Sequence, residues 1–370
     1  MWDKGLFFYT PRTVVGSGPS ITHPNKLVAK EPNMEVTTMK NIIKKIVASV
    51  LSLSMLFALS ACGTAGGSSE KPDTYKVAIV KQMDHPSLDE IANAVAAELD
   101  GFVADGASIT YEIYSGQGDQ SVLMQIGNQA IADGVDAIIP IATTAAQVMA
   151  VCAEETRTPV VFAAVSDPAG AELTGIDYVT GVSDALNTAF IMHMMLAQNP
   201  DVKNVGLLYS LSEINSAAPI ADAKAYLDAK GIAYTEATGN TNDEIIAAAN
   251  TLIAQGVDAV FTPTDNIVMA AELAIYESFI NAGIPHYTGA DSFVRSGAFT
   301  TCGVNYTALG GHAGRLAYQA MTTGMDTLEE FYLAEDGIIT VNTETAAALN
   351  IDYSMFDPMG PVVEVTTTAE

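Results

Sequence analysis

Two adjacent hydroxyl residues, Thr143 and Thr144, follow a short apolar segment and open an Ala-rich stretch of helical character. The first N–H groups of a helix have no partner within it, and the helix dipole adds positive potential there. Two hydroxyls beside such N–H groups form a site for a carboxylate that needs no arginine. This suits a chain with only three arginines after Cys62. The pair therefore predicts a carboxylate site.

Carboxylates follow predicted strands elsewhere in the chain. Asp265 and Asp291 occupy such positions in the second half, and Asp167 does so in the first. Clustered carboxylates favour a cation such as an ammonium group. Together with the two threonines they predict a ligand that carries both charges, namely a free amino acid. The competing use is calcium, but its oxygen ligands usually come from one short, dense loop, and no such run is present.

Further residues of these loops would complete the contacts with the ligand. Asn215 and Ser216 would hydrogen-bond it, and Met83, His85 and Pro86 would cover an apolar side chain. The same polar residue types also cap helices and form turns with no ligand present, so capping is the competing interpretation. A sugar or nucleoside is the competing ligand, although sugar sites commonly stack aromatic rings and these loops contain few.

The sequence gives no support for catalysis. It contains no Gly-x-Ser-x-Gly, Walker A or Gly-x-Gly-x-x-Gly motif, and its histidines lack His-x-x-x-His spacing. The run Met-His-Met-Met at 192–195 resembles a site for a soft metal such as copper. At helical spacing, however, such residues usually belong to the hydrophobic core. We therefore expect no enzyme, no metal site and no cofactor.

An α/β fold must position these residues, because short apolar runs alternate with Ala-rich helical stretches. Strands are predicted over 76–80, 108–114, 137–141, 160–164, 204–209, 233–237, 259–262 and 286–289. Helices are predicted over 88–99, 119–132, 144–154, 217–230, 243–254 and 266–282. Glycines such as Gly134 and Gly256 suit the C-caps of these helices.

The chain also contains an internal duplication. The residues Ile-Ala-Asp-Gly-Val-Asp-Ala-Ile at 131–138 return as Ile-Ala-Gln-Gly-Val-Asp-Ala-Val at 253–260. Two weaker echoes, of 76–80 in 204–208 and of 158–161 in 284–287, follow in the same order. This indicates two doubly wound lobes with parallel sheets. Because ligands of such sheets bind beyond the carboxyl ends of the strands, the site is expected in the cleft between the lobes.

The residues before the first lobe indicate export. Lys40, Lys44 and Lys45 precede an uncharged apolar run over 46–59, which is too short for the roughly 20 residues of a membrane span. The small residues that end in Cys62, followed by a Gly/Ser-rich segment, resemble a bacterial lipoprotein signal in which this cysteine is acylated. An ordinary cleaved signal is the alternative. In both cases the mature protein works outside the cytoplasmic membrane.

The expected start is Met39, with Met34 as the alternative. Removal of residues 1–61 takes seven Lys/Arg and three Asp/Glu from the 16 and 43 of the chain, which leaves a formal charge of about −31. Such a surface repels nucleic acid and anionic lipid headgroups. Cys152 and Cys302 then remain, in a predicted helix and a predicted strand, and we expect two buried free thiols.

Several segments together resemble those of the ABC-transporter substrate-binding lipoproteins, in particular the group that includes the tryptophan/tyrosine import binding proteins. These segments are 76–89, 115–121, 142–147, 164–170, 180–184, 263–268, 303–310 and 341–346. The likeness runs from about residue 76 to residue 351. One departure is Lys81-Gln82-Met83 after the first strand, where apolar or aromatic residues are often found in that family.

The resemblance implies a type I periplasmic-binding fold, with two Rossmann-like lobes joined by a three-crossover hinge. It places lobe 1 at 75–183 and 303–325, and lobe 2 at 184–302 and 326–370. Residues 1–38 would be an unstructured upstream extension, 39–61 the signal peptide and 62–74 a flexible linker.

The resemblance also implies a function: delivery of a solute to an ABC permease by a lipid-anchored monomer that makes and breaks no covalent bonds. A receptor or sensor subunit with the same fold is the alternative. The binding positions carried over are His85, Thr143, Thr144, Ser166, Asp167, Asn215, Ser216, Asp265, Asn266 and Asp291.

Overall fold

The computed structural model describes residues 74–334 and 337–368, and Lys71–Glu370 forms one compact unit. The expected start, signal peptide and lipid-attachment residue Cys62 lie outside the described residues, as does the linker before residue 74. Within the described ranges, no helix has both the length and the apolar character that crossing a bilayer requires.

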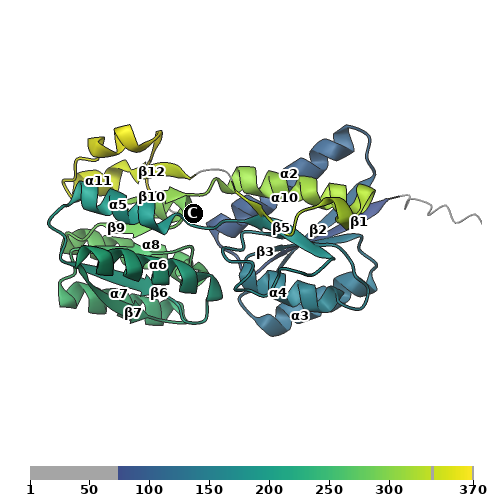
Figure 1. Ribbon diagram of the computed structural model, residues 1–370, viewed down its shortest axis with the longest axis horizontal. Helices are drawn as coiled ribbons and strands as arrows, with labels where there is room; N and C mark the ends of the chain where they lie inside the picture. The colour runs from purple at the N-terminus through teal and green to yellow at the C-terminus, as the bar shows by residue number, and fades with distance from the viewer. Residues whose placement is uncertain (1–73, 335–336, 369–370) are drawn as a thin grey trace, which may run out of the picture. The chain divides into compact units, whose positions relative to one another are not determined.

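A six-stranded parallel sheet forms the centre of the first lobe (Figure 1). In spatial order its strands are β11 (Tyr332–Leu333), β5 (Val179–Ser183), β4 (Val160–Ala163), β3 (Ala137–Ile141), β1 (Tyr75–Lys81) and β2 (Ile109–Ser115). One face is covered by α2 (Pro86–Ala104) and α10 (Tyr306–Thr323), and the other by α3 (Gln120–Ala132) and α4 (Thr143–Ala153).

The four central residues of β1, at 77–80, are apolar without interruption because they are buried on both faces of the sheet. Val77 and Ile79 of β1 pack in the same core as α2 and α10, whereas Ala78 and Val80 pack in the core with α3 and α4. Successive side chains of a strand point to opposite faces, so a strand that is buried on both sides needs an apolar residue at every position.

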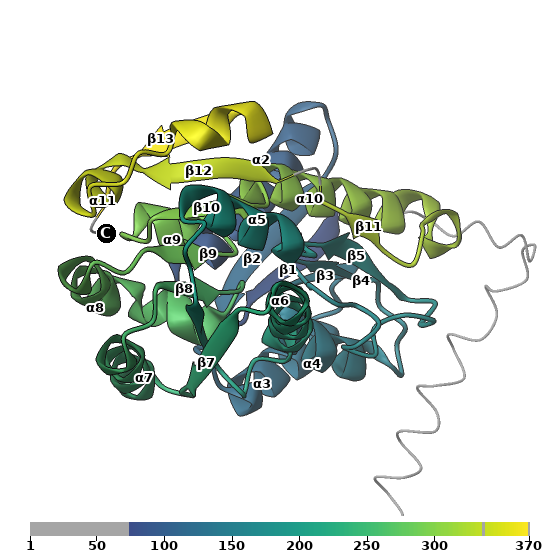
Figure 2. The same ribbon diagram turned by 60° about the vertical axis from the view of Figure 1, so that its left-hand side comes forward.

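A seven-stranded sheet forms the centre of the second lobe. In spatial order its strands are β13 (Val362–Val365), β12 (Ile338–Asn342), β10 (Thr300–Gly303), β9 (His286–Thr288), β8 (Ala259–Thr262), β6 (Asn204–Tyr209) and β7 (Ala233–Thr238). Only the pairing of β10 with β12 is antiparallel among the pairings of the described strands. Figure 2 shows β12 and β13 beside β10 at the edge of this sheet.

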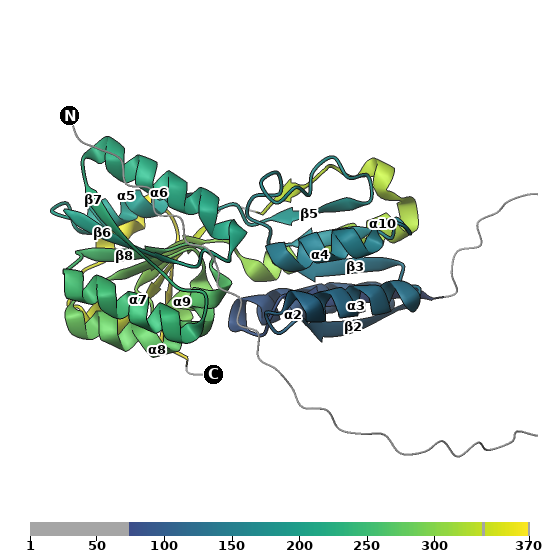
Figure 3. The same cartoon turned by 90° about the horizontal axis from the view of Figure 1, so that it is seen from below.

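Helices cover both faces of the second sheet as well (Figure 3). One face packs against α5 (Thr188–Gln198) and α6 (Ala217–Lys230), and the other against α7 (Asn242–Gln255) and α8 (Asn266–Ala282). Shorter helical segments are α9 (Asp291–Arg295), α11 (Thr343–Ala348), η1 (Ile214–Ser216), η2 (Met325–Thr327) and η3 (Ser354–Met359). The methionines of α5 are core residues, as expected: Met192, Met194 and Met195 are fully buried.

The duplication predicted from the sequence is confirmed, because the strand order β2-β1-β3-β4-β5 of the first sheet recurs as β7-β6-β8-β9-β10 in the second. The repeated aspartates have the same role in both lobes. Asp136 Oδ2 accepts the Lys76 N–H and Asp258 Oδ2 accepts the Asn204 N–H, each at 2.8 Å. The glycine two residues before each aspartate has a positive φ, at which Gly is favoured. The repeated motif thus ends a helix and then connects the start of the following strand, β3 or β8, to the first strand of its lobe, β1 or β6.

The chain passes between the sheets three times, after β5, after β10 and after β11, as the predicted hinge requires. One predicted boundary differs from the structure. The segment 326–333 was assigned to lobe 2, but β11 pairs with β5 of the first sheet, where Tyr332 lies opposite Val182. A two-residue edge strand has too short a pattern to be recognised from sequence.

The eight strands with predicted bounds are found within about two residues. A strand at Cys302, which is β10, was expected without bounds, and β5, β11, β12 and β13 were not predicted. The strand β10 reads Thr-Thr-Cys-Gly, which lacks the apolar pattern of a buried strand, yet all four residues are buried. Its hydroxyls donate to carbonyls of the two neighbouring strands, Thr300 to the Thr340 carbonyl at 2.8 Å and Thr301 to the Thr288 carbonyl at 2.5 Å. Burial of a hydroxyl is tolerated when a hydrogen bond compensates it.

The cysteines depart in part from expectation. Within the described residues neither Cys152 nor Cys302 forms a disulfide, and Cys302 is buried. The expectation that both are buried was wrong for Cys152, which is half-buried. Burial raises the pKa of its thiol.

Candidate functional site

The strand-end loops of the two lobes meet at one place. The loops after β1, β3 and β4 of the first lobe lie against those after β6, β8 and β9 of the second, around a small cavity of about 20 Å³. Its lining residues are His85, Ser87, Leu88, Ala142, Ala164, Ser166, Asp184, Asn215, Thr264, Asp265, Asn266, Met269, Phe293 and Tyr306. We call this cavity the interlobe chamber. Its volume is enough for about one water molecule.

Direct hydrogen bonds connect the lobes around the chamber. The side chain of Gln82 donates through Nε2 to Glu213 Oε1 at 2.7 Å, and His85 Nε2 lies 2.9 Å from Asn266 Oδ1. Two further pairs join hydroxyl oxygens, Ser87 with Ser292 at 2.5 Å and Ser166 with Thr264 at 3.2 Å. The structure is therefore a closed arrangement, and a ligand larger than water enters only when these contacts separate.

The helix α4 reaches the chamber with its N-cap residue Ala142, whereas Thr143 and Thr144 lie directly behind this residue and are not part of the lining. Ala142, at its N-cap, has a φ of +79° and provides no side-chain cap. The Thr143 hydroxyl is buried and, among the described residues, has no hydrogen-bond partner. The Thr144 N–H donates to Gln82 Oε1 at 3.2 Å. Both threonines predicted from sequence thus lie at this helix start, where an unpaired hydroxyl and a helix dipole favour an anionic group.

The imidazole of His85 is neutral and has one unused acceptor. Burial is the main cause that lowers the pKa of His85 to about 4. Asn266 Nδ2 donates to Glu213 Oε2 at 2.6 Å, so the Asn266 oxygen must accept the proton of His85 Nε2. His85 Nδ1 is then an acceptor, and it is buried without a partner among the described residues.

Asp265 caps α8, a structural role that competes with the ammonium-binding role expected from the sequence. Its Oδ1 accepts the N–H groups of Ile267 and Val268, and its Oδ2 accepts the Ser210 N–H and the Ser216 hydroxyl. Both oxygens are therefore occupied inside the second lobe. The prediction of an ammonium acceptor at Asp265 is not supported, because the carboxylate is fully buried and already accepts four hydrogen bonds.

Of the remaining predicted residues, Asn266 also lines the chamber, whereas Ser216 and Asp291 do not. Asn215 and Ser166 line the chamber: Asn215 Nδ2 donates to the Thr264 carbonyl at 2.7 Å, and Ser166 donates to Asp184 at 2.8 Å. Asp167 does not belong with them. It is absent from the lining, and its Oδ1 accepts the Gly170 N–H within its own turn.

Asp291 lies at the start of α9 and forms an ion pair with Arg295, with 2.6 Å between Oδ2 and Nη2. Arg295 also contacts Glu90 of the first lobe at 2.9 Å, so this cluster bridges the lobes beside the chamber. Burial outweighs the attraction of the guanidinium and raises the pKa of Asp291 to about 6.

Glu213 is the carboxyl group that sequence reasoning missed. It is buried, and burial together with the charge of Asp265 raises its pKa to about 7. It lies in the loop after β6, a segment we expected at the site, but a glutamate in a polar loop looks like a solvated residue. Gln82 was missed as well, because a glutamine in a polar loop also looks like a solvated residue. Asp184, whose pKa is raised by burial, and Tyr306 meet at the chamber from two crossovers, which no sequence pattern indicates.

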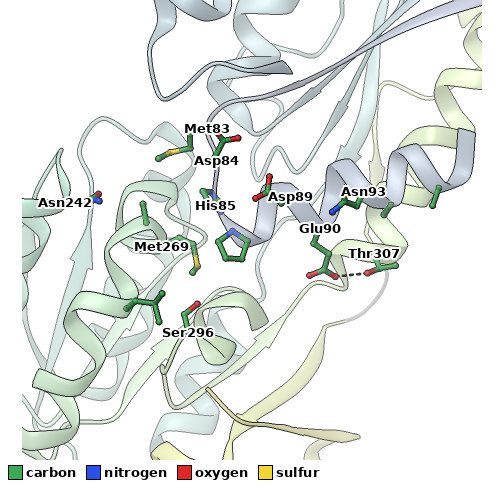
Figure 4. Close-up of a pocket in the computed structure, with 15 residues that line it drawn as sticks. Met83, Asp84, His85, Asp89, Glu90, Asn93, Asn242, Met269, Ser296 and Thr307 are labelled. Atoms are coloured by element: carbon green, nitrogen blue, oxygen red, sulfur yellow. Dashed lines mark hydrogen bonds between the residues drawn. The ribbon is translucent and has the colours of Figure 1, made fainter. Parts of the chain in front are cut away.

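A larger groove of about 1030 Å³ adjoins the chamber (Figure 4). Its wall contains Met83, Pro86, Met269 and Leu273 together with acidic residues of α2. His85 and Met269 line both spaces, so the two are neighbours. In Figure 4, Met83 and His85 lie on the loop between β1 and α2, and Met269 lies on α8. Within the described residues no group of three or more His, Cys, Asp or Glu side chains is arranged to hold a metal ion.

The chain is similar to known proteins along most of its length. Residues 76–355 match the model of a family described as ABC transporter substrate binding protein. A tyrosine-binding protein of Clostridioides difficile (strain R20291) is 27% identical over 338 residues, which are 86% of this chain and 97% of that protein.

Solved structures give the same result. The structure of an ABC domain in complex with L-Trp from Streptococcus pneumoniae has a TM-score of 0.73 and 27% identity, and it covers 78% of this chain and 100% of that one. A conserved domain protein from Vibrio cholerae has a TM-score of 0.69 and 26% identity, with 75% and 95% covered. The predicted type I periplasmic-binding fold is confirmed.

Proposed function

The chain belongs to the ABC transporter substrate-binding protein family, and on this premise we propose that it binds a free amino acid between its lobes and delivers it to an ABC permease. The observation that carries the proposal is the meeting of six strand-end loops, three from each lobe, around the interlobe chamber. A ligand that binds the closed form more tightly than the open form would shift the population toward the closed form, with no covalent chemistry.

The chemistry of the chamber supports a zwitterion. The uncapped start of α4, with the unpaired Thr143 hydroxyl, favours the ligand carboxylate. Buried carboxyl groups outnumber basic groups around the chamber, which favours an ammonium group. The neighbouring groove offers Met83, Met269 and Leu273 to an apolar side chain. An aromatic side chain agrees with this volume and with the tyrosine and L-Trp in the names of the two relatives.

Export and anchoring complete the proposal. The signal over 39–61 would be removed and Cys62 acylated, so that a monomer remains tethered to the outside of the cell membrane. Replacement of Cys62 by Ala tests the anchor. The variant is expected in the aqueous phase after detergent phase partition of cells, whereas the parent protein is expected in the detergent phase.

A thermal-shift screen of the chain from residue 63 tests the ligand. The panel is the twenty amino acids, pentoses and nucleosides, each at 1 mM. Ligand at 100 times its Kd stabilises the folded protein by about 2.7 kcal/mol, which is a readily measured shift in Tm. We expect shifts with tryptophan, tyrosine or phenylalanine. Shifts confined to sugars or nucleosides would show that the ligand class is wrong.

A further inference from the structure

We propose that the carboxylate of Glu213 accepts the ammonium group of the ligand, at the position that the Gln82 side-chain amide occupies in the closed structure. This assignment rests on the proposed function, because it requires an amino acid between the lobes. Glu213 does not itself line the closed interlobe chamber but adjoins it through Asn266 and Asn215, which do. It replaces Asp265 and Asp291, to which the sequence had pointed.

The other buried carboxyl groups near the chamber already have their partners. Asp265 accepts four hydrogen bonds within its own lobe. Asp184 accepts one hydroxyl on each oxygen, from Ser166 and from Tyr306. Asp291 has one free oxygen, but the Arg295 guanidinium lies beside it and would repel a second cation.

Glu213 differs because one of its partners, Gln82, belongs to the other lobe and leaves it when the lobes separate. Its oxygens accept amide hydrogens from Gln82 and Asn266, a third contact is with the Asn215 side chain, and no cationic side chain pairs with it in the described residues. A buried carboxylate without a countercharge is costly, and a cation that reaches it recovers much of that cost. The pKa of Glu213, raised by burial, agrees with this missing charge.

The Gln82 amide also marks the other end of the expected ligand. Its oxygen accepts the Thr144 N–H at the start of α4, while its nitrogen donates to Glu213. The carboxylate and the ammonium group of a free amino acid are about as close together as the oxygen and the nitrogen of this amide. The ligand carboxylate would therefore accept the Thr144 N–H, and the ligand ammonium group would donate to Glu213. Since Gln82 belongs to the first lobe and Glu213 to the second, separation of the lobes frees the Glu213 oxygen for a ligand.

The test compares two ligands that differ only in the ammonium group, L-tryptophan and indole-3-propionate, by isothermal titration calorimetry. Glu213→Gln is expected to weaken L-tryptophan binding about tenfold or more, and indole-3-propionate binding by less than about twofold. Glu277→Gln, an exposed change on α8 of the same lobe, serves as the matched control and should alter neither. Circular dichroism establishes that each variant is folded.

A second readout is independent of affinity. An ammonium group that pairs with Glu213 lowers its pKa, so L-tryptophan binding near pH 6.5 should release protons. Titrations in phosphate and in imidazole, two buffers that titrate near this pH and differ in protonation enthalpy, measure this release, which should be absent in Glu213→Gln. Two results would overturn this assignment but leave the proposed function standing. One is an equal affinity of the parent and of Glu213→Gln for L-tryptophan. The other is a loss of affinity for L-tryptophan, but not for indole-3-propionate, in Asp291→Asn instead. A parent protein that binds no amino acid would overturn the proposed function and this assignment together.

Discussion

The side-chain amide of Gln82 connects the two lobes: its nitrogen lies 2.7 Å from Glu213 Oε1, and its oxygen accepts the Thr144 N–H at 3.2 Å. One neutral group thus contacts both ends of the site at which we expect a charged ligand. The amide therefore stabilises the closed form without ligand and competes with the ligand for the same donors and acceptors.

Gln82→Ala should open the ligand-free protein without weakening ligand binding. The change removes one interlobe hydrogen bond, that with Glu213, with a net contribution of about 1 kcal/mol, from the closed ligand-free form only, because the bond with the Thr144 N–H lies within the first lobe. Small-angle X-ray scattering should give a larger radius of gyration without ligand, and the Kd for L-tryptophan should stay equal or fall. Gln129→Ala, an exposed change on α3, is the control. A tenfold rise in Kd would instead make Gln82 a direct ligand contact.

Asp265→Ala should reduce stability even in the absence of ligand. It removes the cap of α8 and leaves buried donors such as the Ser210 N–H without an acceptor, a loss on the order of 3 kcal/mol. Urea unfolding measures the change. Asp119→Ala removes the exposed cap of α3 and should cost less. A variant as stable as the parent that no longer binds ligand would mean that Asp265 acts on the ligand after all.

The stability of the ligand-free protein should depend on pH through Glu213. Its pKa rises from 4.5 to about 7 on folding, so its contribution to stability is fully present below pH 4.5 and is lost as the pH rises through 7. The Tm of the parent should therefore fall relative to that of Glu213→Gln between pH 5 and 7.5, by the equivalent of on the order of 2 kcal/mol. The contribution of His85 to the pH dependence of stability is the same in both proteins and therefore cancels in this difference. A constant difference would contradict the burial of an ionisable Glu213.

The pair of Glu90 with Arg295 should slow ligand release, because it joins α2 of the first lobe to α9 of the second. The pair is partly exposed and screened by salt, so Glu90→Gln should raise the dissociation rate by only about two- to fivefold at low salt. Stopped-flow dissociation at low salt and in 1 M NaCl measures this, and high salt should remove the difference. Glu98→Gln breaks an ion pair on the same helix but within one lobe, with Arg315, and should leave release unchanged. An effect of Glu90→Gln that persists in 1 M NaCl would rule out the ion pair as its cause.

Local patterns predicted the scaffold well. The Gly-Val-Asp-Ala repeat predicted two matching lobes, and the structure shows that its aspartates fasten equivalent strands. Helix boundaries such as 217–230 and 266–282 were predicted because capping and apolar periodicity depend on neighbouring residues. The bounds of β10 were not predicted, since its threonines are satisfied by carbonyls of strands distant in sequence.

The sequence by itself determined the two-lobed α/β fold, the loops that meet at its centre and the start of α4 at Thr143, because each depends on short-range order along the chain. Only the tertiary structure decided which carboxyl group is available. Asp265 and Glu213 both lie in the expected loops, and their difference arises from partners 55 and 131 residues away. Hydrogen-bond saturation within one lobe and a partner on the opposite lobe are properties of packed groups, which spacing along a chain does not reveal.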